Sequence, residues 1–225
     1  MHDVLELDSF TKAYGERTIL TDIYLKCETG DIIGLFGRNG AGKSTLLKIL
    51  FGTEKGDSKF IRINGKRIAS QSECFREISY LSQDTLIPHD LKVSHVIRLT
   101  ISKDRVDGFM DDPVIRLILN NPVSGLSGGE LRYLEIKLLL HLTSKFVLLD
   151  EPFNGLSPLM IEQVIEMIKT HSARKGIILT DHDYRNVLKV SNRYTILNNG
   201  NLKSMDNKED LVRFGYLSSM GNDKE

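Results

Sequence analysis

The segment GRNGAGKST at positions 37–45 limits what this chain can fold into more than any other stretch of the sequence. It fits the pattern GxxxxGK[ST], and it lies between an almost continuous apolar run at residues 31–36 and a helical pattern at residues 43–51. Glycines allow such a loop to wrap closely around phosphate groups, and backbone N–H groups at the start of the helix then face the negative charge. The segment therefore predicts a nucleotide-phosphate site at a strand–loop–helix junction.

Two side chains of this loop carry specific chemistry. We expect Lys43 to reach the β- and γ-phosphates of the nucleotide and the Ser44 hydroxyl to ligate Mg²⁺. A plain glycine-rich turn before a helix is the alternative, but the strand and the helix on either side favour the phosphate site. The other residues expected to contact the nucleotide are Gly37, Asn39, Gly40, Ala41, Gly42 and Thr45.

A second candidate follows the buried strand expected at residues 146–149, which delivers Asp150 and Glu151 at its carboxyl end. Open α/β sheets bind their ligands at that edge. Asp150 is expected to hold the Mg²⁺ shell, and Glu151 is the natural general base for an attacking water. Two acids after a strand can also form only a solvated loop, but the phosphate loop elsewhere in the chain favours the catalytic interpretation.

The remaining periodicity predicts a single α/β domain over residues 1–225. Alternating segments at residues 4–10 and 18–26 indicate half-exposed antiparallel strands. The segment at about 84–126 changes character and is interpreted as an inserted helical sub-domain. The whole pattern is typical of a P-loop NTPase with a parallel core sheet, an antiparallel β rim and that helical insertion. Further strands are expected at 31–36, 60–63, 78–82, 146–149, 176–180 and 194–197, and helices at 43–51, 94–101, 113–119, 129–142, 158–171 and 183–190.

Composition argues against several classes of function. The 30 Lys and Arg balance the 30 Asp and Glu, so a broadly basic surface that binds nucleic acid by neutralising phosphates is not expected. Cys27 and Cys74 are isolated in sequence, which argues against a disulfide framework or a zinc site and suits a reducing cytosol. No apolar run approaches the ~20 residues that cross a bilayer, and the N-terminus lacks a signal-peptide pattern, so we expect neither feature.

The segment LSGGE at positions 126–130 completes a set of motifs that closely resembles the ATP-binding cassette (ABC) ATPases, and the resemblance covers essentially all 225 residues. The motifs follow the order of that family, and the signature has the form LSGGE in place of LSGGQ. A phosphate loop alone also occurs in kinases and GTPases, whereas signature, acidic pair and switch histidine together are specific. The matching positions are Tyr14, residues 37–45, Gln83, residues 126–130, Asp150 with Glu151, and His182.

The resemblance implies ATP and Mg²⁺ as ligands and gives roles to these positions. Gln83 would contact Mg²⁺ or water and move with the helical sub-domain, and His182 would donate to the γ-phosphate. Together with Lys43 and Glu151 they form the expected catalytic group. Tyr14 would stack on the adenine ring, although it could equally pack against the sheet rim. The expected metal-binding residues are Ser44, Gln83 and Asp150.

The signature makes physical sense as a second anion site, because Ser127, Gly128 and Gly129 precede and open a helical pattern. It lies 84 residues beyond Lys43, and in the family it closes on the ATP held by a second subunit. The resemblance therefore implies a head-to-tail dimer around two ATP, with a second copy of this chain or a different ABC ATPase subunit as the partner. A plain glycine-rich helix cap is the alternative.

These features together predict the ATP-binding and ATP-hydrolysing subunit of an ABC transporter, which drives a separate integral membrane permease from the cytoplasmic face of the membrane. The alternative that stays open is a soluble, non-transport ABC ATPase, for example of the iron–sulfur cluster assembly type. A nucleotide-binding regulator without hydrolysis would require the loss of Lys43 or Glu151, and both are present.

Two departures from the family pattern concern coupling rather than the fold. Residues 154–157 end in Ser157 where the family commonly has Asp, although Ser157 can still cap the helix that follows at Pro158. The segment between Gln83 and the signature is short for the family, so a small or unusual surface toward a membrane partner is expected. After Asp206 only a short helix and a polar tail are expected.

Overall fold

Parallel strands form the centre of the molecule. The computed structural model describes residues 2–85, 87–205 and 210, and these residues include a six-stranded sheet in the order β10-β9-β3-β8-β7-β6. All its neighbouring strands are parallel except the β9–β10 pair, which is antiparallel. The expected parallel core sheet is thus confirmed. The strands are β3 (Ile32–Phe36), β6 (Ile78–Leu81), β7 (Phe146–Asp150), β8 (Gly176–Thr180), β9 (Arg193–Asn198) and β10 (Asn201–Met205).

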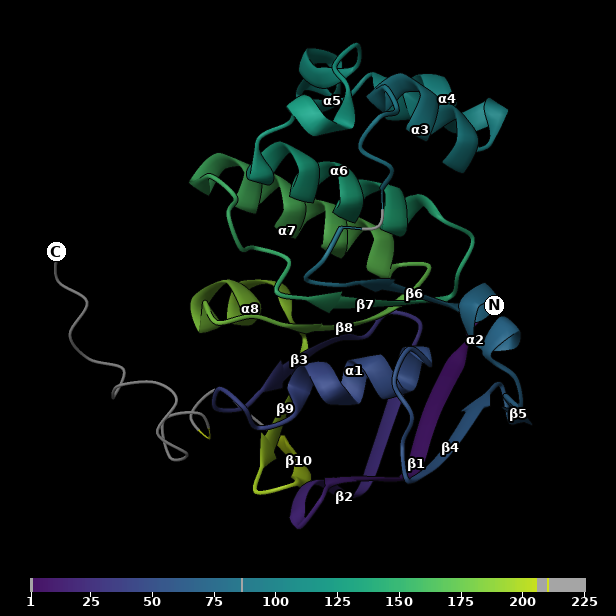
Figure 1. Cartoon of the computed structure of the whole chain (residues 1–225), viewed down its shortest axis with the longest axis vertical. Helices are drawn as coiled ribbons and strands as arrows, with labels where there is room; N and C mark the ends of the chain where they lie inside the picture. Colours follow the sequence, from purple (N-terminus) through teal and green to yellow (C-terminus); the bar gives the residue numbers. More distant parts are fainter. Residues whose placement is uncertain (1, 86, 206–209, 211–225) are drawn as a thin grey trace, which may run out of the picture.

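A second sheet forms the antiparallel rim that the alternating segments predict. Its strand order is β2-β1-β4-β5, and its neighbours pair antiparallel. Leu5, Leu7 and Phe10 of β1 are fully buried and face the helix α1 (Lys43–Phe51), which lies between the two sheets (Figure 1). This packing holds α1, and the loop in front of it, from both sides. The strands of this sheet are β1 (Val4–Tyr14), β2 (Arg17–Glu28), β4 (Ser58–Ile63) and β5 (Lys66–Arg67).

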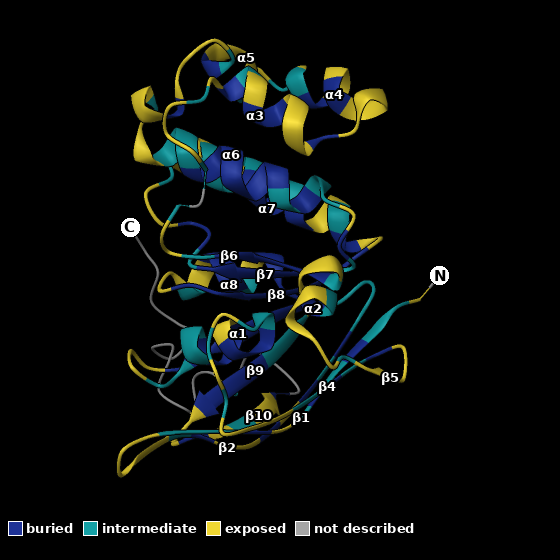
Figure 2. Cartoon of the chain, turned by 45° about the vertical axis from the view of Figure 1, so that its right-hand side comes forward, coloured by how far each residue is buried: buried dark blue, intermediate teal, exposed yellow. Residues whose placement is uncertain are grey.

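The other face of the parallel sheet is covered by the helices α6 (Gly128–His141) and α7 (Pro158–Ser172). Three short helices, α3 to α5, lie beyond α6, so that α6 is buried along most of its length (Figure 2). A helix with neighbours on opposite sides need not be amphipathic, and α6 buries charged as well as apolar side chains, among them Arg132, Glu135 and Lys137. The remaining helices are α2 (Gln71–Glu77), α3 (Val93–Thr100), α4 (Lys103–Met110), α5 (Pro113–Ile118) and α8 (Tyr184–Val190).

The sequence prediction did not include several of the elements, among them the helices α2 and α4 and the strand β10. The helix α2 is short and polar and shows no apolar period, but Ser70 and Glu73 form a reciprocal capping box that defines its start. The helix α4 contains Gly108 and buries only two side chains on the helical sub-domain. The strand β10 is mostly exposed and is defined by its hairpin with β9. The sub-domain bounds 84 and 126 stay a prediction, and the helix expected after Asp206 falls on residues that the structure does not describe.

The two cysteines, Cys27 and Cys74, are both free and buried. No helix in the described part of the chain has the length and the apolar character that crossing a membrane requires.

Two histidines meet where α6 and α7 end. The rings of His141 and His171 lie 4.6 Å apart between centroids, and the edge of Phe109 packs against His141 at 4.9 Å. Each Nδ1 lies within 3 Å of a backbone carbonyl oxygen one turn earlier, which suits the neutral ring with Nδ1 protonated. Burial lowers the pKa of His141 to about 4 and lowers the pKa of His171 as well.

The histidine pair predicts a loss of stability in mild acid. The unfolded chain binds a proton at His141 near pH 6.5, whereas the folded chain binds it only near pH 4, so the free energy of unfolding falls as the pH drops through this interval. After allowance for the partly exposed ring, we expect His141 to account for about 1–2 kcal/mol of this loss. Urea denaturation measured across the interval should show a shallower pH dependence for His141→Gln than for wild type, and equal slopes would contradict the prediction.

Candidate nucleotide site

The loop between β3 and α1 is shaped by glycines and closed by its own lysine. Gly42, the N-cap of α1, has φ +104°, and a Cβ atom there would lie 2.5 Å from the Ile19 side chain, so only glycine fits. Lys43 is buried and donates from Nζ to the carbonyl oxygen of Gly37 at 2.6 Å and of Arg38 at 3.3 Å. Burial lowers the pKa of Lys43, and the nearby charges of Asp150 and Glu151 oppose this effect. The loop is therefore compact, with its cation beside two carboxylates.

Asp150 ends β7 and is completely buried. Its Oδ1 accepts a hydrogen bond from the Ser44 hydroxyl at 3.0 Å, and its Oδ2 accepts one from the Tyr80 hydroxyl at 3.0 Å. Burial raises the pKa of Asp150, and these two hydrogen bonds act in the opposite direction. The site thus holds a carboxylate whose two oxygens both have fixed donors.

The residues around Asp150 fit Mg²⁺. A hydroxyl and a carboxylate oxygen, from Ser44 and Asp150, lie within contact of each other at the loop, and these are the hard ligands that Mg²⁺ prefers. The described residues contain no group of three His, Cys, Asp or Glu that could hold a metal by themselves. This donor set therefore suits a cation that completes its shell with water and phosphate oxygens.

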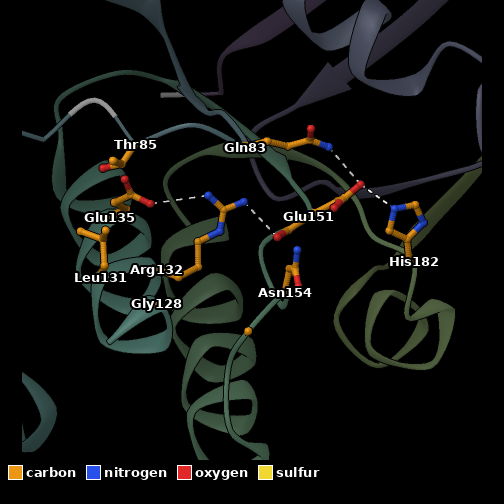
Figure 3. Close-up of a pocket in the computed structure, with 10 residues that line it drawn as sticks. Gln83, Thr85, Gly128, Leu131, Arg132, Glu135, Glu151, Asn154 and His182 are labelled. Carbon is orange, nitrogen blue, oxygen red and sulfur yellow. Dashed lines mark hydrogen bonds and ion pairs between the residues drawn. The ribbon is translucent and has the colours of Figure 1, made fainter. Parts of the chain in front are cut away.

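Glu151 contacts two of the other expected catalytic residues, Gln83 and His182. Its Oε1 lies 3.1 Å from Gln83 Nε2 and 2.7 Å from His182 Nε2 (Figure 3). Its backbone has φ +53°, a left-handed conformation that is unfavourable for a residue with a side chain. A hydrogen bond from Glu151 N to the Thr180 carbonyl oxygen, at 2.8 Å, holds this conformation. Such strain is of the order of 1–3 kcal/mol and is concentrated at functional sites.

A cavity of about 530 Å³ joins these groups, a volume suited to a nucleotide-sized ligand. Tyr14 lies at its rim with half of its surface exposed, and its hydroxyl contacts Glu54. Gly37 is not among the lining residues, and its carbonyl oxygen is bound by Lys43. The expected site residues that line the cavity are Tyr14, Asn39, Gly40, Ala41, Gly42, Lys43, Ser44, Thr45, Gln83, Asp150, Glu151 and His182.

The signature lies apart from this cavity. Ser127 is the N-cap of α6, and the carboxylate of Glu130 accepts hydrogen bonds from both its backbone N–H and its hydroxyl at 2.8 Å. Ser127, Gly128 and Gly129 do not line the 530 Å³ cavity. Gly128 lines a neighbouring cavity of about 590 Å³, which shares Gln83, Glu151 and His182 with the first one. A single chain therefore brings the phosphate loop and the acidic pair together without the signature.

The loop after the acidic pair packs against the signature helix. Ser157 caps α7 through its hydroxyl, which accepts a hydrogen bond from Met160 N at 3.4 Å, and Pro158 opens the helix. This cap confirms the predicted role of Ser157 in the fold. A Cβ atom on Gly129 would lie 2.8 Å from the Gly155 carbonyl oxygen, so the two main chains approach closely at this point.

Sequence reasoning missed Arg132, a buried cation that joins α6 to two strand ends. Its guanidinium donates to the carbonyl oxygen of Ser82 at 2.7 Å. It also donates to the carbonyl oxygen of Glu151 at 3.0 Å and lies 3.5 Å from the Glu135 carboxylate (Figure 3). Tyr80 was missed in the same way. An arginine between the apolar residues Leu131, Tyr133 and Leu134 is a signal that could have found the first, whereas a tyrosine in a strand is not distinctive.

Comparison with known proteins places these observations in a family. The family model described as ABC transporter matches residues 20–154. The lipopolysaccharide export system ATP-binding protein LptB of Haemophilus influenzae is 31% identical over 223 residues, which cover 93% of this chain and 92% of that protein. LptB of Escherichia coli K12 is 32% identical over 214 residues, 88% of each chain.

Solved structures agree with the sequence comparison. A structure described as the ATP-binding subunit of an ABC transporter superposes with a TM-score of 0.81 and 26% identity, and covers 95% of this chain and 94% of its own. A nucleotide-free ATP-binding cassette from an ABC transporter superposes with a TM-score of 0.80 at 18% identity and 94% coverage of both chains, which supports the fold.

The contact between the signature helix and the loop at residues 154–157 predicts different effects at two adjacent glycines. Gly129→Ala should lower the free energy of unfolding by about 1–3 kcal/mol, because its methyl group meets a backbone oxygen that cannot rotate away. Gly128→Ala is the matched control, since no atom lies within 4 Å of a Cβ there, and alanine favours a helix over glycine by about 1 kcal/mol. Urea denaturation of both variants tests this, and equal stability would contradict the close approach.

Proposed function

This chain belongs to the ABC transporter family as one of its ATPase subunits, and from that premise we propose that two subunits close head to tail around two ATP and drive a separate membrane protein. The observation that carries the catalytic part is the convergence of Gln83 and His182 on one oxygen of Glu151, beside the phosphate loop. Three groups that suit water activation and phosphate binding thus share one cavity.

The proposed mechanism assigns a task to each of these side chains. Lys43 exchanges its loop carbonyl partners for the β- and γ-phosphates, which offer a buried cation a charged partner. Glu151 takes the proton of the attacking water, and His182 donates to the γ-phosphate, so the present contact between them opens when nucleotide enters. Mg²⁺, held by Ser44, Asp150 and Gln83, would neutralise charge on the phosphates.

The proposed dimer follows from the position of the signature. The phosphate cavity contains no donor from Ser127, Gly128 or Gly129 of the same chain. The N-terminus of α6, a helix of 14 residues, provides backbone N–H groups and a positive dipole end that suit an anion. A second subunit would therefore supply these groups to the γ-phosphate across the interface. A second copy of this chain satisfies the requirement by two-fold symmetry.

A groove beside Gln83 supports the proposed membrane partner. This cavity of about 250 Å³ lies between β6, α3 and α6, and its lining is mostly apolar. Asp84, directly after Gln83, also lines it, so a partner bound there would touch the segment that carries a site residue. We place the membrane subunit in this groove and the chain on the cytoplasmic face of the membrane. The apolar lining includes Leu81, Ile87, Pro88, Val96, Leu138, Leu139 and Leu142.

The role of Glu151 as the base predicts a specific loss of catalysis. Glu151→Gln should lower steady-state ATP hydrolysis by at least about 100-fold, because the amide cannot accept the proton of the water. ATP binding should persist and hold the subunits as a dimer. Phosphate release and size-exclusion chromatography with ATP measure the two effects, with Glu162→Gln on the exposed face of α7 as the control. Hydrolysis at the wild-type rate in Glu151→Gln would contradict the assignment.

The apolar groove predicts that a negative charge introduced into it weakens the attachment of the chain to the membrane. Leu139→Glu should reduce the fraction of the chain that sediments with membranes of its own cells, because it puts a carboxylate into an apolar contact. Leu117→Glu, at an exposed leucine of the same helical region, should leave this fraction unchanged. Wild-type chain that stays in the supernatant would favour the non-transport alternative instead.

A further inference from the structure

Tyr80 is a buried tyrosine whose hydroxyl points at the carboxylate of the proposed metal site. It lies in β6, next to β7, with 6% of its surface exposed. Its hydroxyl lies 3.0 Å from Asp150 Oδ2. An ionised carboxylate can only accept hydrogen bonds, so Tyr80 is the donor.

The hydrogen bond from Tyr80 complements the one from Ser44. Ser44 Oγ contacts Asp150 Oδ1 at 3.0 Å, on the other oxygen of the same carboxylate. Rotation of the carboxylate about its last bond would weaken both contacts at once. The two donors, one from β6 and one from α1, therefore define which oxygen faces the phosphate loop.

The ring of Tyr80 is itself fixed by aromatic packing. Phe51 lies 5.4 Å from it between ring centroids, and the ring of Phe75 lies 4.7 Å from that of Phe51. Phe51 belongs to the helix α1 that also carries Ser44. Both donors to Asp150 are thus positioned against the same helix, which favours a fixed carboxylate over a mobile one.

We propose that Tyr80 is a positioning residue for Mg²⁺, which orients Asp150 so that its Oδ1 faces Ser44 and the metal. This inference rests on the proposed ATP site and extends it to a residue outside the family motifs quoted above. Tyr80 does not line the phosphate cavity. Its effect should therefore appear in the metal-dependent part of nucleotide binding and not in the metal-free part.

The test compares Tyr80→Phe with wild type in calorimetric binding of a non-hydrolysable ATP analogue, once with Mg²⁺ and once with EDTA. We expect the Mg²⁺-dependent gain in affinity to fall by about 3- to 10-fold, the range for the net contribution of one ordinary hydrogen bond, and the affinity in EDTA to stay unchanged. Tyr133→Phe is the matched control, because its buried hydroxyl donates to Asp112 at 2.8 Å, away from the cavity.

A second measurement keeps the test valid if the Tyr80→Phe variant is less stable than wild type. The shift in melting temperature on adding Mg²⁺ to the nucleotide-bound protein is compared within each variant, and it should be smaller for Tyr80→Phe than for Tyr133→Phe. An unchanged Mg²⁺ gain, or an equal loss with and without Mg²⁺, overturns the inference. If wild type binds no nucleotide at all, the proposed function itself fails and the inference fails with it.

Discussion

The ends of the parallel strands are the constraint on which the site depends. Every residue of β3, β7 and β8 is buried, so these strands have almost no room for polar side chains along their length. Charged side chains of these three strands therefore lie where the strands end, and the carboxyl ends of parallel strands meet at one common edge of the sheet. The phosphate loop, Asp150 and His182 all follow directly from this geometry. The helix α1 completes it, because the second sheet presses it against the same edge.

Backbone carbonyl groups at this edge of the sheet need hydrogen-bond donors from outside the sheet, and Arg132 of α6 provides them. Carbonyl oxygens at the ends of β6 and β7 lose their ladder partners where the strands stop. The guanidinium of Arg132, with several donors in one plane, reaches the carbonyl oxygens of Ser82, Asp150 and Glu151 together. The carbonyl oxygen of Glu151 is one of these three acceptors, so Arg132 helps to stabilise the left-handed backbone of this residue. The hydrogen bonds of Arg132 thus satisfy the backbone carbonyl groups at the strand ends and also hold the proposed catalytic residue Glu151 in place.

What could be predicted from the sequence depends on the distance between the interacting residues along the chain. The phosphate loop is a contiguous segment, and its chemistry requires specific residues at specific spacings, so it indicated both a strand and a helix. Tyr80 and Asp150 are 70 positions apart, and nothing in either segment indicates the other. Arg132 contacts Ser82 across 50 positions. The helices α2 and α4 were missed because caps and neighbours define them rather than an apolar period.

The close approach of Gly129 and Gly155 has a consequence for how this region can vary. Where two main chains touch with no side chain between them, the local surface is determined by backbone dihedrals and not by residue chemistry. A side chain at Gly129 would deform it, because a Cβ atom there would lie 2.8 Å from the Gly155 carbonyl oxygen. The distance between the signature helix and the loop at residues 154–157 is therefore set by their main chains.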